Sequence, residues 1–145
     1  MPILAAHAAE VNVMAAIRKN DTRASVNEAG LELRSVQAGE ILVGFERWPK
    51  GRVEGLFEGL DGNECQASHW GYVIRGKVRV RTAQGEKLVQ AGEAYHLAPG
   101  HTLVEVLEPV ELVEFTPAKD PYLADSVKAF QRNLPKVLAT LKATH

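Results

Sequence analysis

Glycine and proline residues divide the middle of the chain into short apolar runs, and this spacing restricts the fold more than any other feature. Between residues 30 and 116 the runs are short and are separated by turn residues. Short strands at intervals of about 8–12 residues are typical of an antiparallel sandwich or barrel rather than of alternating β and α units. At residues 77–82, Val78, Val80 and Thr82 alternate with basic residues, which predicts a strand with one buried and one exposed face.

The size and charge of the chain limit its class. Its 145 residues suit one domain, so we expect a single domain over residues 1–145 with the barrel at about 30–117. A net charge of −1 gives no electrostatic reason to expect nucleic acid or a membrane as partner. The lone Cys65 excludes an internal disulfide, no apolar run approaches the ~20 residues of a membrane span, and residues 1–10 lack the features of a secretory signal. These observations predict a soluble, cytoplasmic protein.

Both ends of the chain carry helical signals. The segment from Ala8 to about Lys19 has near-helical apolar spacing and predicts a short helix or an ordered arm. After the last strand, Asp120 and Pro121 suit a helix start, because a carboxylate can cap the first turn and proline is tolerated at the first helical position. We expect C-terminal helices at about 120–143, divided where Pro135 ends or kinks the first of them.

Two sequence segments resemble the motifs of a known superfamily. YVIRGKV at 72–78 matches the end of the first motif of the cupins, and AGEAYHLAPGH at 91–101 matches their second motif. The run CQASHWGYVIRG at 65–76, followed by a PGH turn, resembles a subset of single-domain cupins. This resemblance implies a cupin-type antiparallel β-barrel (a double-stranded β-helix or jelly roll). It implies little about the reaction, because cupins host many chemistries.

The ligand pattern departs from the one usual in cupins. His69 stands where the first motif normally has glutamate, and no histidine occupies the HxH positions, near which Glu64 and Cys65 lie. In the second motif Leu103 occupies the usual histidine position and His101 lies two residues earlier. Histidine, cysteine and carboxylate side chains bind divalent transition metals. The candidate metal ligands are therefore His69, His101, His96, Cys65 and Glu64.

Each candidate ligand also has a structural interpretation. His69 and His101 can be buried histidines bonded to backbone or carboxylate groups, and a free cysteine is commonly a small buried apolar residue. Glu64 follows a turn and can be solvated. On the His69 strand, Gly71 shares the histidine's face and would leave space for a ligand beside it, while Trp70 and Tyr72 fall on the opposite face.

Two functions fit these residues, and no catalytic residue can be assigned. One is a metal-dependent enzyme of the dioxygenase or isomerase type, in which a divalent Zn, Fe, Mn or Ni ion binds a small organic molecule. The other is a non-catalytic protein that binds or senses a small molecule without metal. Because the strand that begins at His69 is apolar on both faces, a helix or a second subunit should cover its outer face, so we expect a homodimer.

Overall fold

The computed structural model describes residues 10–11 and 16–144, and nine strands of this part form one sheet. The strands are β1 (Glu10–Val11), β2 (Arg23–Glu28), β3 (Leu31–Ala38), β4 (Ile41–Trp48), β5 (Gly51–Arg52), β6 (His69–Thr82), β7 (Gly85–Gln90), β8 (Ala94–Leu97) and β9 (Thr102–Pro117). Their order is β1-β3-β4-β9-β6-β7, with β2, β5 and β8 paired to β3, β9 and β6. All of these pairs are antiparallel except β1 with β3. The predicted antiparallel barrel is confirmed.

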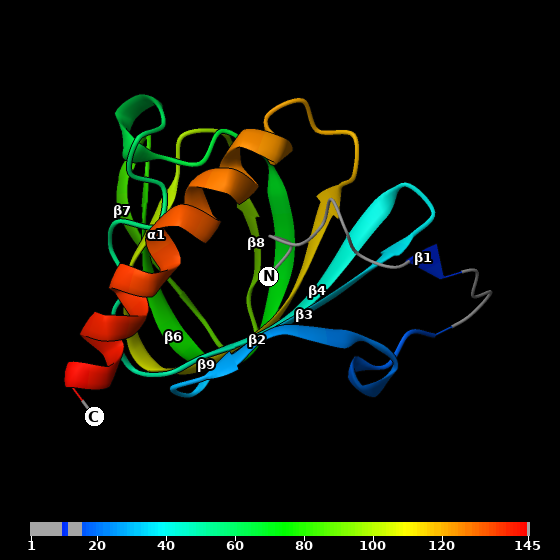
Figure 1. Ribbon diagram of the computed structural model, residues 1–145, viewed down its shortest axis with the longest axis horizontal. Helices are drawn as coiled ribbons and strands as arrows, with labels where there is room; N and C mark the ends of the chain where they lie inside the picture. The colour runs from blue at the N-terminus through cyan, green and yellow to red at the C-terminus, as the bar shows by residue number, and fades with distance from the viewer. Residues whose placement is uncertain (1–9, 12–15, 145) are drawn as a thin grey trace.

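The sheet curls around a core that one long helix, α1 (Leu123–Ala143), helps to cover (Figure 1). Alternation in β6 is as predicted: Val78 and Val80 are buried and their basic neighbours are not. From the helix, Phe130 contributes a ring that packs edge-on to Trp48 at 6.2 Å and beside Phe57 at 6.0 Å between centroids. The apolar stripe of α1 therefore completes the core at the barrel's open side.

Where it is described, the N-terminal part is not an α-helix, and the ordered arm stays a prediction. Half of the predicted helix or arm from Ala8 to Lys19 lies outside the described residues. Within that range, Glu10–Val11 form a strand and 16–18 are not helical, and a 3-10 turn follows at Lys19–Asp21. Strand β2 also extends the sheet to residues before 30, the position at which the sequence predicted that the barrel starts. Turn residues mark loops in a sequence more clearly than they mark the edge strands beside those loops.

The predicted end of a first C-terminal helix at Pro135 is wrong. A single helix runs from Leu123 to Ala143 with Pro135 inside it. Proline costs this helix one backbone hydrogen bond, but Leu134, Val137 and Leu138 around it are buried against the barrel. Tertiary packing thus outweighs the local preference of one residue.

Asp120 does not cap the helix as the sequence predicted. The helix begins at Leu123, and its N-cap residue Tyr122 has no side-chain cap. Instead, Asp120 accepts a hydrogen bond from the Tyr122 backbone at 2.9 Å and another from the Ser68 backbone at 3.0 Å. The carboxylate thereby ties the turn before α1 to the segment that enters β6.

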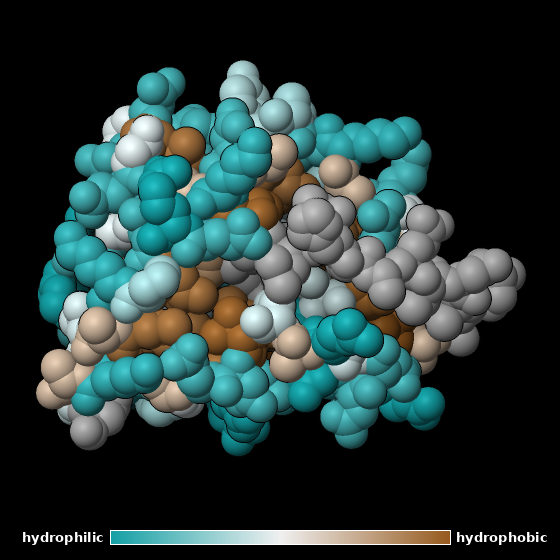
Figure 2. All heavy atoms as spheres, in the orientation of Figure 1, coloured by the Kyte–Doolittle hydropathy of each residue, from teal (hydrophilic) through white to brown (hydrophobic). Residues whose placement is uncertain are grey.

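Two apolar areas remain at the surface of the described part. The outer face of β6 exposes Trp70, Tyr72 and Ile74 by 44%, 46% and 50%, so α1 does not cover it and the homodimer stays a prediction. On the face drawn in Figure 2, an apolar strip lies beside α1, where Val26 and Leu138 line a groove. No helix of the described residues is both long enough and apolar enough to span a bilayer.

Candidate metal centre

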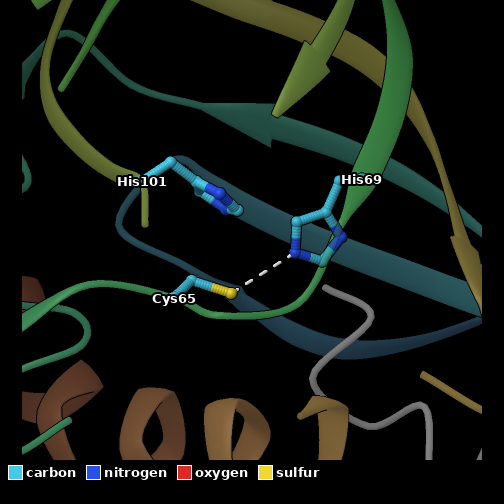
Figure 3. A group of neighbouring side chains, drawn as sticks. All are labelled: Cys65, His69 and His101. Atoms are coloured by element: carbon cyan, nitrogen blue, oxygen red, sulfur yellow. Dashed lines mark hydrogen bonds between the residues drawn. The ribbon is translucent and has the colours of Figure 1, made fainter. Parts of the chain in front are cut away.

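Three buried side chains, Cys65, His69 and His101, meet inside the barrel (Figure 3). His69 is the first residue of β6, and His101 directly precedes β9. A short antiparallel bridge joins Cys65 to His101, where the Cys65 N–H donates to the His101 carbonyl oxygen at 2.7 Å. The Pro99-Gly100 turn and the loop before β6 therefore place three ligand-type atoms within 4.8 Å of one another.

Hydrogen bonds on the far side of each ring orient the two histidines. His101 Nδ1 lies 2.7 Å from the Ala98 carbonyl oxygen, which can only accept, so Nδ1 carries the proton and Nε2 keeps a lone pair. His69 Nδ1 lies 2.7 Å from Thr116 Oγ1, and its Nε2 lies 3.5 Å from Cys65 Sγ. Such outer partners are what fix the orientation of metal-binding histidines in proteins.

Burial sets the protonation state of the cluster. Loss of hydration lowers the pKa of His69 to about 4 and that of His101 to about 4, so both rings are neutral at pH 7, the form that binds metal. Burial raises the pKa of the Cys65 thiol to about 11. A bound cation would therefore have to displace the thiol proton, as metals do when they coordinate cysteine.

The donor set and its spacing suit a tetrahedral ion. Zn–S and Zn–N bonds of about 2.3 and 2.0–2.1 Å place sulfur and nitrogen about 3.6 Å apart on a tetrahedral edge. Cys65 Sγ and His69 Nε2 are already 3.5 Å apart. Three protein ligands leave a fourth position open, as in catalytic rather than structural zinc sites.

Two buried carboxyl groups and a tyrosine lie next to this cluster, and none of the three is among the predicted ligands. Tyr95 donates to Glu114 Oε1 at 2.8 Å, and Glu114 Oε2 is 3.6 Å from His69 Nδ1. Because His69 is neutral, the latter contact is not a full ion pair. Burial raises the pKa values of Glu46 and Glu114 to about 7 each, and burial raises that of Tyr95 well above 10.

The signal for these carboxyl groups was present in the strand pattern. Glu46 lies between Gly44 and Trp48 on the buried face of β4, and Glu114 between Leu112 and Thr116 on that of β9. Acidic residues at core-facing positions are rare unless they are paired or functional.

A cavity of about 50 Å³ connects the carboxyl groups with the histidines. Since one water needs about 10–15 Å³ of such space, the cavity has room for a small molecule of a few non-hydrogen atoms. Its polar lining comes from the histidines, both glutamates and Tyr95, and its apolar lining includes Val80, Leu103 and Phe130. The site can therefore present polar groups to a small molecule while apolar walls exclude bulk water.

The structure does not bring the other two candidate ligands to this cluster. His96 is exposed on the outer face of β8, where its ring stacks on Trp70 at 4.7 Å between centroids. Glu64 is half-buried beside the Gly62 turn, apart from the three ligand atoms. The space expected beside His69 at Gly71 is also absent, because the Tyr95 ring fills it: a Cβ at Gly71 would lie 2.3 Å from Tyr95 Cζ.

Comparisons with known proteins support the fold. No protein-family model and no curated protein sequence matches the chain. Among solved structures, an RmlC-like cupin from Shewanella frigidimarina is 18% identical with a TM-score of 0.51, over 76% of this chain and 96% of that one. The polyketide cyclase RemF from Streptomyces resistomycificus is 19% identical with a TM-score of 0.50, over 75% and 82%.

A longer protein shows the same likeness. The oxalate decarboxylase of Lactobacillus farciminis, solved as a formate complex, is 16% identical with a TM-score of 0.52 over 75% of this chain. The chain spans about a third of the length of such decarboxylases. It covers 31% of the Bacillus subtilis enzyme and 35% of the Lactobacillus farciminis enzyme. At these identities the likeness shows the fold, and the chain has that of a cupin.

Proposed function

We propose that this protein is a metal-dependent cupin that binds a small organic molecule at a divalent transition-metal ion held by Cys65, His69 and His101. The observation that carries the proposal is the convergence of three buried ligand atoms within 4.8 Å, on residues of which His69 and His101 also line a cavity. A thiolate with two neutral imidazoles suits Zn²⁺ or Fe²⁺ better than Mn²⁺, which favours oxygen ligands.

The bound ion would act as a Lewis acid toward a carbonyl or similar oxygen at its open position. The chain's own residues orient the ligand set and the small molecule. Thr116 and the Ala98 carbonyl fix the rings of His69 and His101. Ser126 Oγ lies 3.4 Å from Cys65 Sγ and accepts the thiol hydrogen until the sulfur binds metal. Apolar walls keep bulk water from this arrangement.

Metal analysis of untagged protein tests the proposal. Protein loaded with Zn²⁺ or Fe²⁺ and then desalted should retain about one ion per chain by mass spectrometry. His69→Ala and His101→Ala should each reduce metal affinity by at least tenfold, since each removes one of three protein ligands.

His96→Ala is the matched control, because it removes an exposed histidine that lies outside the cluster. It should leave metal content unchanged. Wild-type protein that stays far below one ion per chain, or an equal loss in His96→Ala, would rule out the metal site.

A metal-free binding protein is the second candidate, favoured by the largely apolar cavity wall. In that case small-molecule binding would survive both chelation and the His69→Ala substitution. Under the first proposal both treatments weaken it.

A further inference from the structure

Glu46 holds a buried oxygen atom that the described residues leave without a hydrogen bond. Its Oε1 accepts from Trp48 Nε1 at 3.0 Å, while Oε2 finds no partner among residues 10–11 and 16–144. The residue is only 6% exposed. An unpaired buried polar atom destabilises the folded protein, so its persistence at a cavity wall points to a partner that the cavity admits.

The cavity joins this oxygen to the metal ligands. Glu46, His69 and His101 all line it, and the negative charge of Glu46 acts against the burial that lowers the pKa of His69. A volume of about 50 Å³ corresponds to about three to five water-sized positions. A molecule of about five non-hydrogen atoms therefore fits.

A hydroxyl group suits Glu46 Oε2 better than other polar groups. A hydroxyl both donates and accepts, so it can pair with this oxygen whether or not the carboxyl carries a proton. It is also neutral, which matters because burying a charged ammonium or carboxylate in a cavity with apolar walls is costly.

We propose that the cavity selects small hydroxycarbonyl compounds, with the hydroxyl group bonded to Glu46 Oε2 and the carbonyl oxygen directed to the Cys65–His69–His101 cluster. The carbonyl half of this inference rests on the proposed metal function, and the hydroxyl half does not. Glu46 is thus a specificity-determining residue, and Trp48, Val80 and Leu103 limit the size of what binds.

Hydroxyacetone and butanone form a matched pair of probes, because they share a skeleton and differ by a hydroxyl in place of a methyl group. The reporter is the indole N–H of Trp48, which bonds Glu46 directly. The chain has two tryptophans, and Trp70 is 44% exposed on the outer face. In proton–nitrogen NMR spectra, Trp70 thus serves as an internal control, and Trp70→Phe assigns the two signals.

In metal-free protein, hydroxyacetone should shift the Trp48 signal saturably and leave that of Trp70 in place. Butanone should bind at least about tenfold more weakly, as expected for one lost hydrogen bond to a carboxyl group. Glu46→Leu should bring the two affinities within about twofold. Glu46→Gln keeps the shape of the side chain. It should lower the ratio of the hydroxyacetone affinity to the butanone affinity at least about threefold.

Three results would each overturn the inference. They are equal affinities of the wild type for the two probes, no shift of the Trp48 signal with either probe, and an affinity ratio that both Glu46 variants leave unchanged. The same titrations with Zn²⁺ separate it from the proposed function. If the metal fails to bind, the hydroxyl preference can still hold in metal-free protein. If the metal binds and the preference is absent, the inference alone fails.

Discussion

The ring of Tyr95 lies directly over Gly71, in the space that any larger residue at that position would need. The two residues pair across β6 and β8, and a Cβ at Gly71 would meet two ring carbons and the hydroxyl oxygen of Tyr95 at 2.3–2.6 Å. Tyr95 in turn bonds Glu114, which contacts His69. The glycine thereby positions a chain of polar contacts that ends at a candidate ligand.

We expect Gly71→Ala to destabilise the protein by about 1–3 kcal/mol, because overpacking a buried site displaces its neighbours. Urea unfolding of the wild type and the variant measures the change. The double variant Gly71→Ala with Tyr95→Leu should lose less free energy of unfolding than the sum of the losses in the two single variants, since the clash is with the tyrosine ring. Strict additivity would show that the ring is not what excludes a side chain at Gly71.

The sequence predicts the barrel well because period-two alternation and turn residues are local signals. The long strand β9 shows where such signals fail. Proline usually ends or interrupts a strand, but β9 runs through Pro109 from Thr102 to Pro117. The neighbouring β6 accommodates it with irregular pairing around Gly76, where a Cβ would lie 2.1 Å from the Pro109 carbonyl oxygen. Such a bulge depends on two segments distant in sequence.

The candidate site was harder to predict because a shift of one residue along a strand reverses its face. His96 was proposed as a ligand, yet its neighbour Tyr95 points inward and His96 points outward. Cys65, His69 and His101 could be named from residue type and motif position. The strand pattern marks Glu46 as a core-facing acidic residue but not its relation to His69, which arises only when β4 and β6 close around the same cavity.

Pro135 should cost α1 stability, because proline offers no N–H to the preceding turn. The residue is exposed within an otherwise continuous helix. We expect Pro135→Ala to raise the free energy of unfolding by about 1–2 kcal/mol, after allowing for the greater entropy that alanine gives the unfolded chain. The neighbouring exposed Lys136→Ala should stay within about 0.5 kcal/mol. Chemical denaturation compares the two, and a destabilised Pro135→Ala would contradict this account.

Glu32 should make stability fall in acid. Lys19, Arg34 and Arg47 each place a nitrogen 2.9 Å from its carboxylate. Hydrogen bonds from Lys19 and Arg34 lower its pKa from 4.5 to about 2. Since the folded pKa is the lower one, this stabilisation is present above pH 4.5 and is lost as the pH falls toward 2.

Glu32→Gln removes this titration while keeping the shape of the side chain. The wild type should be more stable than the variant by roughly 1–3 kcal/mol at pH 7, and the gap should narrow between about pH 5 and pH 2. Unfolding midpoints across that range measure it. A gap that stays constant with pH would show that the ionised carboxylate is not the stabilising form.

Metal should stabilise the folded chain, because the three ligands come together only when the loop before β6 and the turn before β9 are in place. A ligand that binds only the folded state adds about 2.7 kcal/mol at a hundredfold excess over its Kd, or roughly 8–12 °C in Tm for a domain of this size. We expect Zn²⁺ to raise the Tm of the wild type and of His96→Ala by this amount. Cys65→Ser should lose most of the rise, because a hydroxyl is a poor substitute for a thiolate toward Zn²⁺. Scanning calorimetry with and without a chelator is the measurement, and a Tm that zinc leaves unchanged in the wild type would contradict binding at the folded cluster.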